Sequence, residues 1–305
     1  MEQFDITLLG GDARIAYMAP CLLEKKCRVI CYGTQKLAES RGYPVIYAKN
    51  LEEAVEQADC IVGGIPLLKD KKICSGQTLP DMEEDELYRY LKKGQMVFGG
   101  VIPEDFMEQC RQREISCHDF MKDEPLAVLN AVATAEGAIL EALKWQKTNI
   151  HGSESLVVGY GRCGRVLAEK LKGLDARVTV CSSSEVELAC ANTFGMDTLP
   201  LGKLEQKISA YEYIYNTVPA VVLDRKVLGQ MRQDALIIDI ASGAGGVDYF
   251  AAGELGVSAL HCLGLPGKYA PKISAKQLAD FVIRRYQEDR VSQLTKSNSI
   301  VKGVF

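Results

Sequence analysis

Short apolar runs alternate with segments of helical spacing along the chain. In the first half, four apolar runs have the length of buried strands, and each ends at a glycine: residues 5–9, 27–32, 59–62 and 96–98. Helical spacing is found between them at 15–25, at 51–57 and in the acidic stretch 81–90. Strands that alternate with helices predict parallel sheets with crossover connections, so the expected class is α/β.

The second half repeats this alternation more regularly. Its strand-like runs lie at residues 155–158, 177–181, 213–216, 236–240 and 257–262. The segment 132–147 has apolar positions at helical spacing and is long enough to connect two domains. A last helical pattern occupies residues 274–289, and the polar tail after it is expected to fray.

These patterns, in a chain of 305 residues, predict two Rossmann-like domains with parallel sheets. The first domain covers residues 1–130 and is completed by the C-terminal helix at 274–290. A connecting helix at 131–148 leads to the second domain at 149–273, which we expect to be a doubly wound sheet.

The formal net charge of −4 provides no broad positive field, so neither nucleic acid nor an anionic membrane is an expected partner. The chain starts without a basic leader, and charged residues interrupt every candidate for the roughly 20 apolar residues of a membrane helix. The 11 cysteines are scattered and include no CxxC pair, which predicts reduced thiols and no metal cluster. The expected location is the cytoplasm.

The first strand of the second half leads directly into a GxGxxG pattern. It is formed by Gly159, Gly161 and Gly164, with Arg162 and Cys163 before the last glycine. The first glycine permits a tight turn, the second lets the backbone approach a diphosphate, and the third lets a helix pack closely on the strand. We therefore predict that this loop binds a nicotinamide dinucleotide. The alternative is a glycine turn that has lost its ligand.

The end of the following strand distinguishes NAD from NADP, because an acid there binds a free ribose 2′-hydroxyl. The residues at this point are Ser182, Ser183 and Ser184, with no acid before Glu185. Three hydroxyls and the nearby Arg162 favour a 2′-phosphate, so NADP is preferred and NAD is the alternative. Serines are also ordinary turn residues.

Two further strand ends are expected to flank the ribose and the nicotinamide, since open α/β sheets bind ligands at the carboxyl ends of their strands. Asn216, Thr217, Val218 and Pro219 end one strand, and the segment 239–243, with Asp239, Ala241 and Ser242, ends the next. Turn formation or helix capping is the alternative role of the polar residues among them.

The glycine loop and five other stretches, in their order, resemble the family of the dipicolinate synthase A subunit: GGDAR at 10–14, TAEGA at 134–138, IHGS at 150–153, IDIAS at 238–242 and GLPGKYAPK at 264–272. The resemblance implies an NADP-dependent oxidoreductase subunit of sporulating bacteria. Together with the flavoprotein-like B subunit of dipicolinate synthase, it would convert dihydrodipicolinate into dipicolinate, which is pyridine-2,6-dicarboxylate. It also implies an architecture similar to that of formate and glycerate dehydrogenases.

The chain departs from this resemblance at two points. Family members usually carry an arginine and a proline after the IDIAS-like strand, whereas this chain has a glycine-rich loop at 242–246, so an expected anion contact is missing. The catalytic histidine of the wider hydroxyacid dehydrogenases has no clear counterpart here, because His261 lies on the strand before the GLPGKYAPK stretch.

A dicarboxylate substrate requires cations or backbone donors in its site. Arg14 in the GGDAR turn and Lys268 in the GLPGKYAPK loop are the candidates for a clamp on the two carboxylates. Glu136 on the connecting helix is the candidate base for the proton that is lost when the ring becomes aromatic. Simple exposure to solvent is the alternative for all three residues.

Two other functions are open at this point. The missing arginine favours a different dehydrogenase of the same architecture, which would act on a small hydroxy or imino acid. The chain could also be a non-catalytic subunit that binds NADP while its partner carries out the chemistry. Self-association of the chain is open as well.

Overall fold

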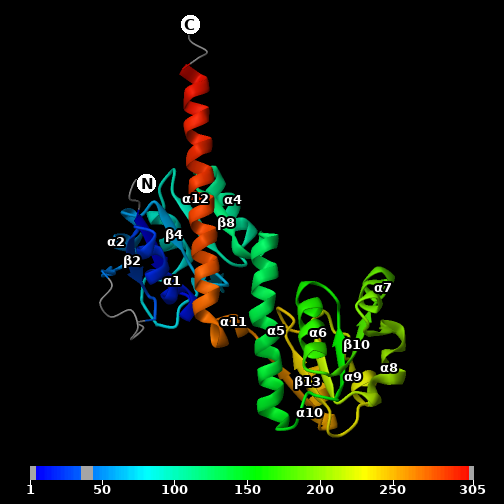
Figure 1. The fold of residues 1–305 in the computed structure, drawn as a ribbon. Helices are drawn as coiled ribbons and strands as arrows, with labels where there is room; N and C mark the ends of the chain where they lie inside the picture. The colour runs from blue at the N-terminus through cyan, green and yellow to red at the C-terminus, as the bar shows by residue number, and fades with distance from the viewer. Residues whose placement is uncertain (1–4, 36–43, 302–305) are drawn as a thin grey trace. The chain divides into compact units, whose positions relative to one another are not determined.

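The computed structural model describes residues 5–35 and 44–301, with only the backbone described for Asp5 and for 291–301. By their internal contacts the described residues form two units, one made of those in 5–127 and 270–301 and one made of 128–269. Each unit contains one six-stranded parallel sheet (Figure 1). The predicted fold class, two Rossmann-like domains with parallel sheets, is confirmed.

The first unit is built around a sheet with the strand order β3-β2-β1-β4-β7-β8. Its strands are β1 (Asp5–Leu9), β2 (Arg28–Tyr32), β3 (Ile46–Tyr47), β4 (Cys60–Val62), β7 (Met96–Gly99) and β8 (Ser116–Asp119). After β1 the chain adds β2 and β3 on one side of it. The strands β4, β7 and β8 then follow on the other side of β1. In a doubly wound sheet this change of direction opens a crevice at the carboxyl ends of the two central strands.

Helices cover both faces of this sheet: α1 (Ala13–Glu24), α2 (Leu51–Glu56), α3 (Glu84–Tyr90), α4 (Glu104–Gln112) and α12 (Pro271–Val301). A small antiparallel hairpin of β5 (Leu68–Lys69) and β6 (Lys72–Ile73) follows β4. Helix α1 begins two residues earlier than predicted, because the Asp12 side chain accepts a hydrogen bond from the Arg14 N–H and caps the helix.

The last helix packs along the first one (Figure 1). Leu278, Phe281 and Val282 of α12 share a core cluster with Ile15 and Met18 of α1. Burial of each such side chain stabilises the fold by about 1.5–3 kcal/mol, so segments from the two ends of the chain hold this unit together. The helix is longer than its sequence pattern predicted, since its backbone continues through the polar tail.

The second unit has the same sheet topology, with the strand order β11-β10-β9-β12-β13-β14. Its strands are β9 (Glu154–Val158), β10 (Arg177–Ser182), β11 (Asp197–Pro200), β12 (Tyr213–Asn216), β13 (Leu236–Asp239) and β14 (Ser258–His261). Its helices are α6 (Arg162–Gly173), α7 (Glu185–Thr193), α8 (Leu204–Lys207), α9 (Arg225–Leu228), α10 (Tyr249–Leu255) and α11 (Leu265–Tyr269). The change of direction falls between β9 and β12.

The long helix α5 (Glu124–Gln146) enters the second unit at Val128. It is long and apolar enough to cross a membrane by length and composition, and Glu136 and Glu141 interrupt its apolar residues as expected. Half of its most apolar stretch is buried inside the chain, and Ala135, Ala138 and Ala142 lie in the core cluster of the second unit. The helix is therefore buried in the way that a core helix of a folded unit is.

The first unit contains a partly buried histidine, His118, on β8. The His118 ring stacks on Phe98 with 4.8 Å between ring centroids, and its Nε2 lies 3.2 Å from Asp289 Oδ2 of α12. Burial lowers the pKa of this imidazole, although Asp289 partly opposes the shift, and Arg285 and Glu288 also face the ring. The folded chain therefore binds this proton less readily than the unfolded chain does.

We expect the free energy of unfolding of the first unit to fall as the pH decreases through about 6.5, the ordinary histidine value. Above that pH the contribution of His118 to the free energy of unfolding is fully present. As the pH falls further, this contribution decreases by at most about 1.4 kcal/mol per pH unit, until the imidazole of the folded chain is also protonated. Urea denaturation between about pH 5 and 8 should show this slope, and His118→Gln should flatten it. His151→Gln, at an exposed ring, is the control. Equal slopes in both variants would contradict the assignment.

Candidate functional site

The glycine loop between β9 and α6 has the geometry that its sequence predicted. Gly159 has a φ of +89°, and a Cβ there would lie 2.4 Å from Thr217 Oγ1. A Cβ on Gly164 would lie 2.2 Å from the carbonyl oxygen of Gly159, so the helix packs directly on the turn. A Cβ on Gly161 meets no described atom within 4 Å. Two of the glycines are thus required by the fold, and the third faces open space.

The N-terminus of α6 is available to an anion. Gly161 is its N-cap residue, and in the described part of the chain no side chain caps the helix. The first N–H groups of a helix attract negative charge, and here they follow a glycine that leaves room for a ligand. Arg162 and Cys163 form the first turn, where burial raises the pKa of the Cys163 thiol and keeps it neutral. These residues fit the diphosphate of a dinucleotide.

At the end of β10, two of the three predicted serines have structural roles. The buried Ser182 hydroxyl donates to Glu187 Oε2 at 2.6 Å and accepts from the Ser184 N–H. Ser184 is the N-cap of α7 and accepts from the Glu187 N–H at 3.3 Å. Ser183 is exposed. The sequence analysis missed Glu187, which lies on α7 and reaches back to the end of the strand.

A buried pair joins the ends of β12 and β13. Asn216 and Asp239 are both fully buried, and Asn216 Nδ2 donates to Asp239 Oδ1 at 2.8 Å. Asn216 also donates to the Val218 carbonyl and accepts from the Val218 N–H, which fixes the predicted segment Thr217–Pro219. Thr217 donates its hydroxyl to the Val158 carbonyl at 2.9 Å. The pair therefore ties the turn after β12 to the strand ends beside the glycine loop.

Asp239 also organises the loop that contains Ala241 and Ser242. Its carboxylate accepts hydrogen bonds from the N–H groups of Ala241 and Gly246 and from the Tyr249 hydroxyl, at 2.7–3.0 Å. His261 Nε2 lies 3.1 Å from the Ala241 carbonyl oxygen. The sequence placed Asp239 at this strand end, among the residues expected to flank the cofactor, but it gave no sign of Tyr249, which reaches the carboxylate from α10.

The two cations proposed as a substrate clamp already have carboxylate partners within their own units. Arg14 is buried, and its guanidinium forms a fork with Asp12, with Nη2 at 2.7 Å from Oδ2. Lys268 lies on the short helix α11, not in a loop as predicted, and pairs with Glu141 of α5. The lysine and Tyr269 lower the pKa of the Glu141 carboxyl. Solvent exposure, the alternative for Arg14, is wrong.

Glu136 is also paired. Its Oε1 lies 2.8 Å from Lys170 Nζ of α6. Lys170 lies eight residues beyond Arg162 in the first turn of that helix, which is about 12 Å along the helix axis. This contact places Glu136 beside the second half of α6 rather than at the glycine loop.

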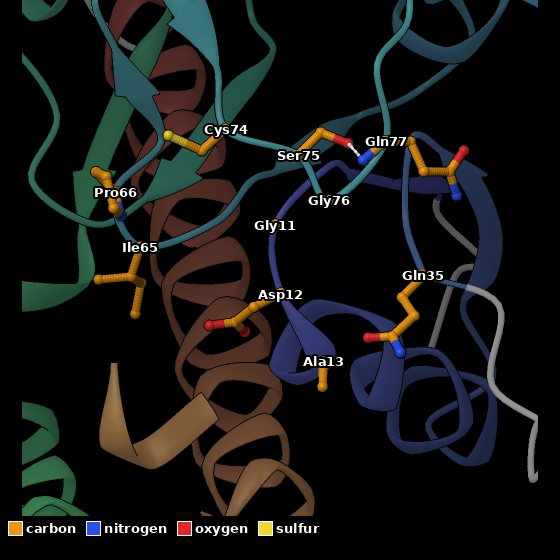
Figure 2. Close-up of a pocket in the computed structure, with 10 residues that line it drawn as sticks. All are labelled: Gly11, Asp12, Ala13, Gln35, Ile65, Pro66, Cys74, Ser75, Gly76 and Gln77. Carbon is orange, nitrogen blue, oxygen red and sulfur yellow. Dashed lines mark hydrogen bonds between the residues drawn. The ribbon is translucent and has the colours of Figure 1, made fainter. Parts of the chain in front are cut away.

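The first unit has a pocket of about 610 Å³. Its lining comes from the turns after β1, β2, β4 and β6: Gly11, Asp12, Ala13, Gln35, Ile65, Pro66, Cys74, Ser75, Gly76 and Gln77 (Figure 2). It therefore lies at the change of direction between β1 and β4, where doubly wound sheets bind ligands.

One half-exposed carboxylate and several uncharged polar groups give this pocket its polarity. Asp12 caps α1, and Arg14 holds it in place while also approaching the carbonyl of Ile65, another lining residue. The Ser75 hydroxyl accepts from the Gln77 N–H at 2.9 Å (Figure 2). It also donates to the Gly33 carbonyl. Arg14 thus lies directly behind the pocket wall.

The glycine loop and the fold of the second unit identify the class of protein to which this unit belongs. A βαβ unit with this glycine loop at an open helix N-terminus is a dinucleotide-binding domain of the dehydrogenase type. Residues 125–248 match the family described as D-isomer specific 2-hydroxyacid dehydrogenase, NAD binding domain. A nicotinamide dinucleotide is therefore the cofactor type of this unit, as the sequence predicted.

Sequence matches of the first unit and of the whole chain identify particular relatives. Residues 5–121 match the family of the N-terminal domain of the dipicolinate synthase A subunit. The A subunit of dipicolinate synthase from Bacillus subtilis (strain 168) is 28% identical over 290 residues, which are 93% of this chain and 96% of the relative.

Two solved structures agree with this sequence match. The dipicolinate synthase A subunit from Bacillus halodurans is 27% identical, with a TM-score of 0.82 over 92% of this chain and 97% of that chain. The corresponding structure from Bacillus subtilis is 25% identical, with a TM-score of 0.83 over 96% of this chain and 98% of that chain. The predicted resemblance to the dipicolinate synthase A subunit is confirmed over nearly the whole chain.

Proposed function

We propose that this chain oxidises dihydrodipicolinate to dipicolinate, with hydride transfer to NADP, as a cytoplasmic protein that works with the flavoprotein-like B subunit of dipicolinate synthase during sporulation. The observation that carries the proposal is the open glycine loop at α6 in a chain similar throughout to the dipicolinate synthase A subunit. The oxidation removes one hydride and one proton from the dihydropyridine ring and leaves an aromatic ring, so it requires alignment and one proton acceptor.

The dinucleotide would be held by the residues around the glycine loop, and when bound it supplies the hydride acceptor. The amides that follow Gly161 would receive the diphosphate. The Asn216–Asp239 pair fixes the strand ends that would flank the ribose and nicotinamide. For the coenzyme itself, the exposed Ser183 and the first-turn Arg162 favour the 2′-phosphate of NADP, and the carboxylate of Glu187 favours NAD.

NADP and NAD binding measured side by side by calorimetry decides between the two coenzymes. We expect the lower Kd for NADP. A lower Kd for NAD would assign the ribose contact to Glu187 and overturn the NADP preference.

The pocket of the first unit is the proposed place for the substrate ring. Both carboxylates are paired with a cation, Asp12 with Arg14 and Glu136 with Lys170, but only Asp12 lines this pocket, so it is the better candidate to accept the proton of a ring bound there. Asp12→Asn keeps the helix cap and should lower kcat without changing the affinity for NADP. The reverse pattern, with an effect of Glu136→Gln and none of Asp12→Asn, would return the role to Glu136.

Arg14 and Lys268 remain the proposed cations for the substrate carboxylates. A hydrogen bond to a charged group contributes about 1.5–3 kcal/mol, so Arg14→Ala and Lys268→Ala should each raise KM for the dicarboxylate roughly tenfold or more. The Kd of NADP should not change. Arg111→Ala, at an exposed ion pair of the first unit, is the matched control. Unchanged kinetics in both variants would remove the clamp from the account.

The direct test of the function is turnover of dihydrodipicolinate by the purified chain, followed by the absorbance of reduced nicotinamide, with and without the B subunit. We expect turnover with NADP. Turnover of a hydroxy or imino acid in a substrate panel, and none of dihydrodipicolinate, would assign the chain to a different dehydrogenase. If NADP binds but no hydride transfer occurs with or without the B subunit, the chain is a non-catalytic cofactor-binding subunit.

A further inference from the structure

The pocket of the first unit is lined by four side chains that form strong hydrogen bonds: Asp12, Gln35, Ser75 and Gln77 (Figure 2). Within the described residues, its lining includes no lysine, arginine or histidine. A substrate with two carboxylates therefore depends, inside this pocket, on donors that carry no charge. Such donors can bind a ligand only where the chain itself does not use them.

Three of the four side chains are occupied by the chain itself. Asp12 accepts hydrogen bonds from the N–H and the guanidinium of Arg14. The Ser75 hydroxyl and the Gln77 side-chain amide both donate to backbone carbonyls of the turn after β2, each at 2.7 Å. These groups thus hold the walls of the pocket together.

Gln35 differs from the other three. In the part of the chain that the structure describes, its side-chain amide has no hydrogen-bond partner. Figure 2 shows this side chain extending from its turn toward the start of α1. A glutamine amide offers two N–H donors and one carbonyl acceptor. Gln35 is therefore the lining side chain whose donors are available to a ligand.

The turn that carries Gln35 is held by side chains of the turn after β6. Gly33 has a φ of +66°, and its carbonyl accepts from Ser75. Thr34 is buried, and its carbonyl accepts from Gln77. A donor on a backbone that is already ordered loses less conformational entropy when it binds a ligand. The turn thus presents Gln35 to the pocket before any ligand is bound.

The charge of Asp12 limits how a dicarboxylate can lie in this pocket. A substrate carboxylate close to the Asp12 oxygens would be repelled, although Arg14 behind the wall partly balances their charge. Figure 2 shows the Gln35 amide apart from Asp12, with Ala13 between them. A carboxylate at this amide gains donors and avoids the repulsion. The rest of the ring can then face Asp12, the group proposed above to accept the ring proton.

We propose that Gln35 determines the specificity of this pocket for a carboxylate: its amide N–H groups donate to one carboxylate of the ring substrate and turn the ring toward Asp12. The proposal rests on the proposed function and extends it, because neither of the cations proposed for the carboxylates lines the pocket itself. A ligand without an acceptor at this point would leave the ordered donors without a partner, which lowers its affinity.

Calorimetry of two ligands in the presence of NADP tests the proposal: dipicolinate, and its monoamide, in which one carboxylate is a carboxamide. Gln35→Ala removes the donors and should raise the Kd of dipicolinate roughly tenfold. Gln35→Glu places a carboxylate against a carboxylate and should raise it roughly 100-fold. The monoamide can donate its NH2 group to the new carboxylate, so its Kd should rise less than about tenfold. Gln35→Glu is therefore expected to shift the preference from dipicolinate toward the monoamide by about tenfold or more.

Gln112→Ala, at an exposed glutamine of α4 in the same unit, is the control and should change neither Kd. The Kd of NADP and the melting temperature should be the same in all variants. If dipicolinate binds the unchanged chain and Gln35→Glu leaves the preference as it was, the proposal is overturned while the proposed function stands. If dipicolinate does not bind to a chain that binds NADP, both are overturned.

Discussion

Gly161→Ala should abolish most of the affinity for the dinucleotide while leaving the second unit folded. A Cβ at this position meets no described atom within 4 Å, and the backbone, with φ of −73°, suits alanine. The new methyl group would instead occupy the space where the diphosphate approaches the backbone. We expect the Kd of NADP to rise roughly 100-fold, since the approach of the backbone provides the diphosphate contacts. Calorimetry measures the Kd of NADP for this variant and for the unchanged chain.

Two other glycines of α6 serve as controls for this result. A Cβ on Gly164 would lie 2.2 Å from a backbone oxygen, so Gly164→Ala should destabilise the unit by about 1–3 kcal/mol as well as weaken binding. Gly173→Ala, at the other end of the helix and in open space, should leave the NADP affinity unchanged. The loss of stability in Gly161→Ala should stay within about 1 kcal/mol, the cost of a poorer N-cap. Unchanged affinity of Gly161→Ala would refute the diphosphate site.

Asp239→Ala should cause the largest loss of stability among single changes at the candidate site. Four donors would lose their common acceptor: the Asn216 amide, the N–H groups of Ala241 and Gly246, and the Tyr249 hydroxyl. Buried donors without partners cost about 1–3 kcal/mol each, and partial rearrangement limits the sum, so we expect a loss of about 3–5 kcal/mol. Urea denaturation, followed by the fluorescence of Trp145 in the second unit, measures it.

Asp248→Ala is the matched control in the same loop. Asp248 is the N-cap of α10 and accepts one hydrogen bond, from the Ala251 N–H. Its loss should cost about 1 kcal/mol, as for other N-caps. If the two variants lose the same stability, Asp239 does not organise the loop as described. Asp239→Asn should lie between them, because its amide retains one acceptor for the four donors.

The central strands could be predicted from the sequence because they are apolar runs of strand length, and those of the first sheet are also followed by glycines or end in one. The bounds of β1 and β12 agree with the prediction, and those of β10 and β13 differ by one residue. The outer strands β3, β8 and β11 were not predicted. β8 has the sequence Ser-Cys-His-Asp, since a strand at the edge of a sheet does not require a continuous apolar run. Its place in the sheet follows from tertiary packing alone.

The candidate site could be predicted where its chemistry is local. The glycine loop is a contiguous pattern whose three glycines have distinct roles, so the sequence contains all of its information. The ion pair of Lys268 with Glu141 and the contact of Ser182 with Glu187 depend on how helices pack or reach back to a strand. The environment of Asp239 depends on where a glycine-rich loop folds. Such contacts are set by the tertiary structure and leave no periodic signal in the sequence.

A crystal structure of the chain grown with NADP tests the central claim most directly. The account predicts electron density for the coenzyme along the carboxyl ends of β9, β10 and β12, with the diphosphate on the first amides of α6 beside Gly161. Density for the coenzyme in the pocket of the first unit, with the glycine loop empty, would contradict the account.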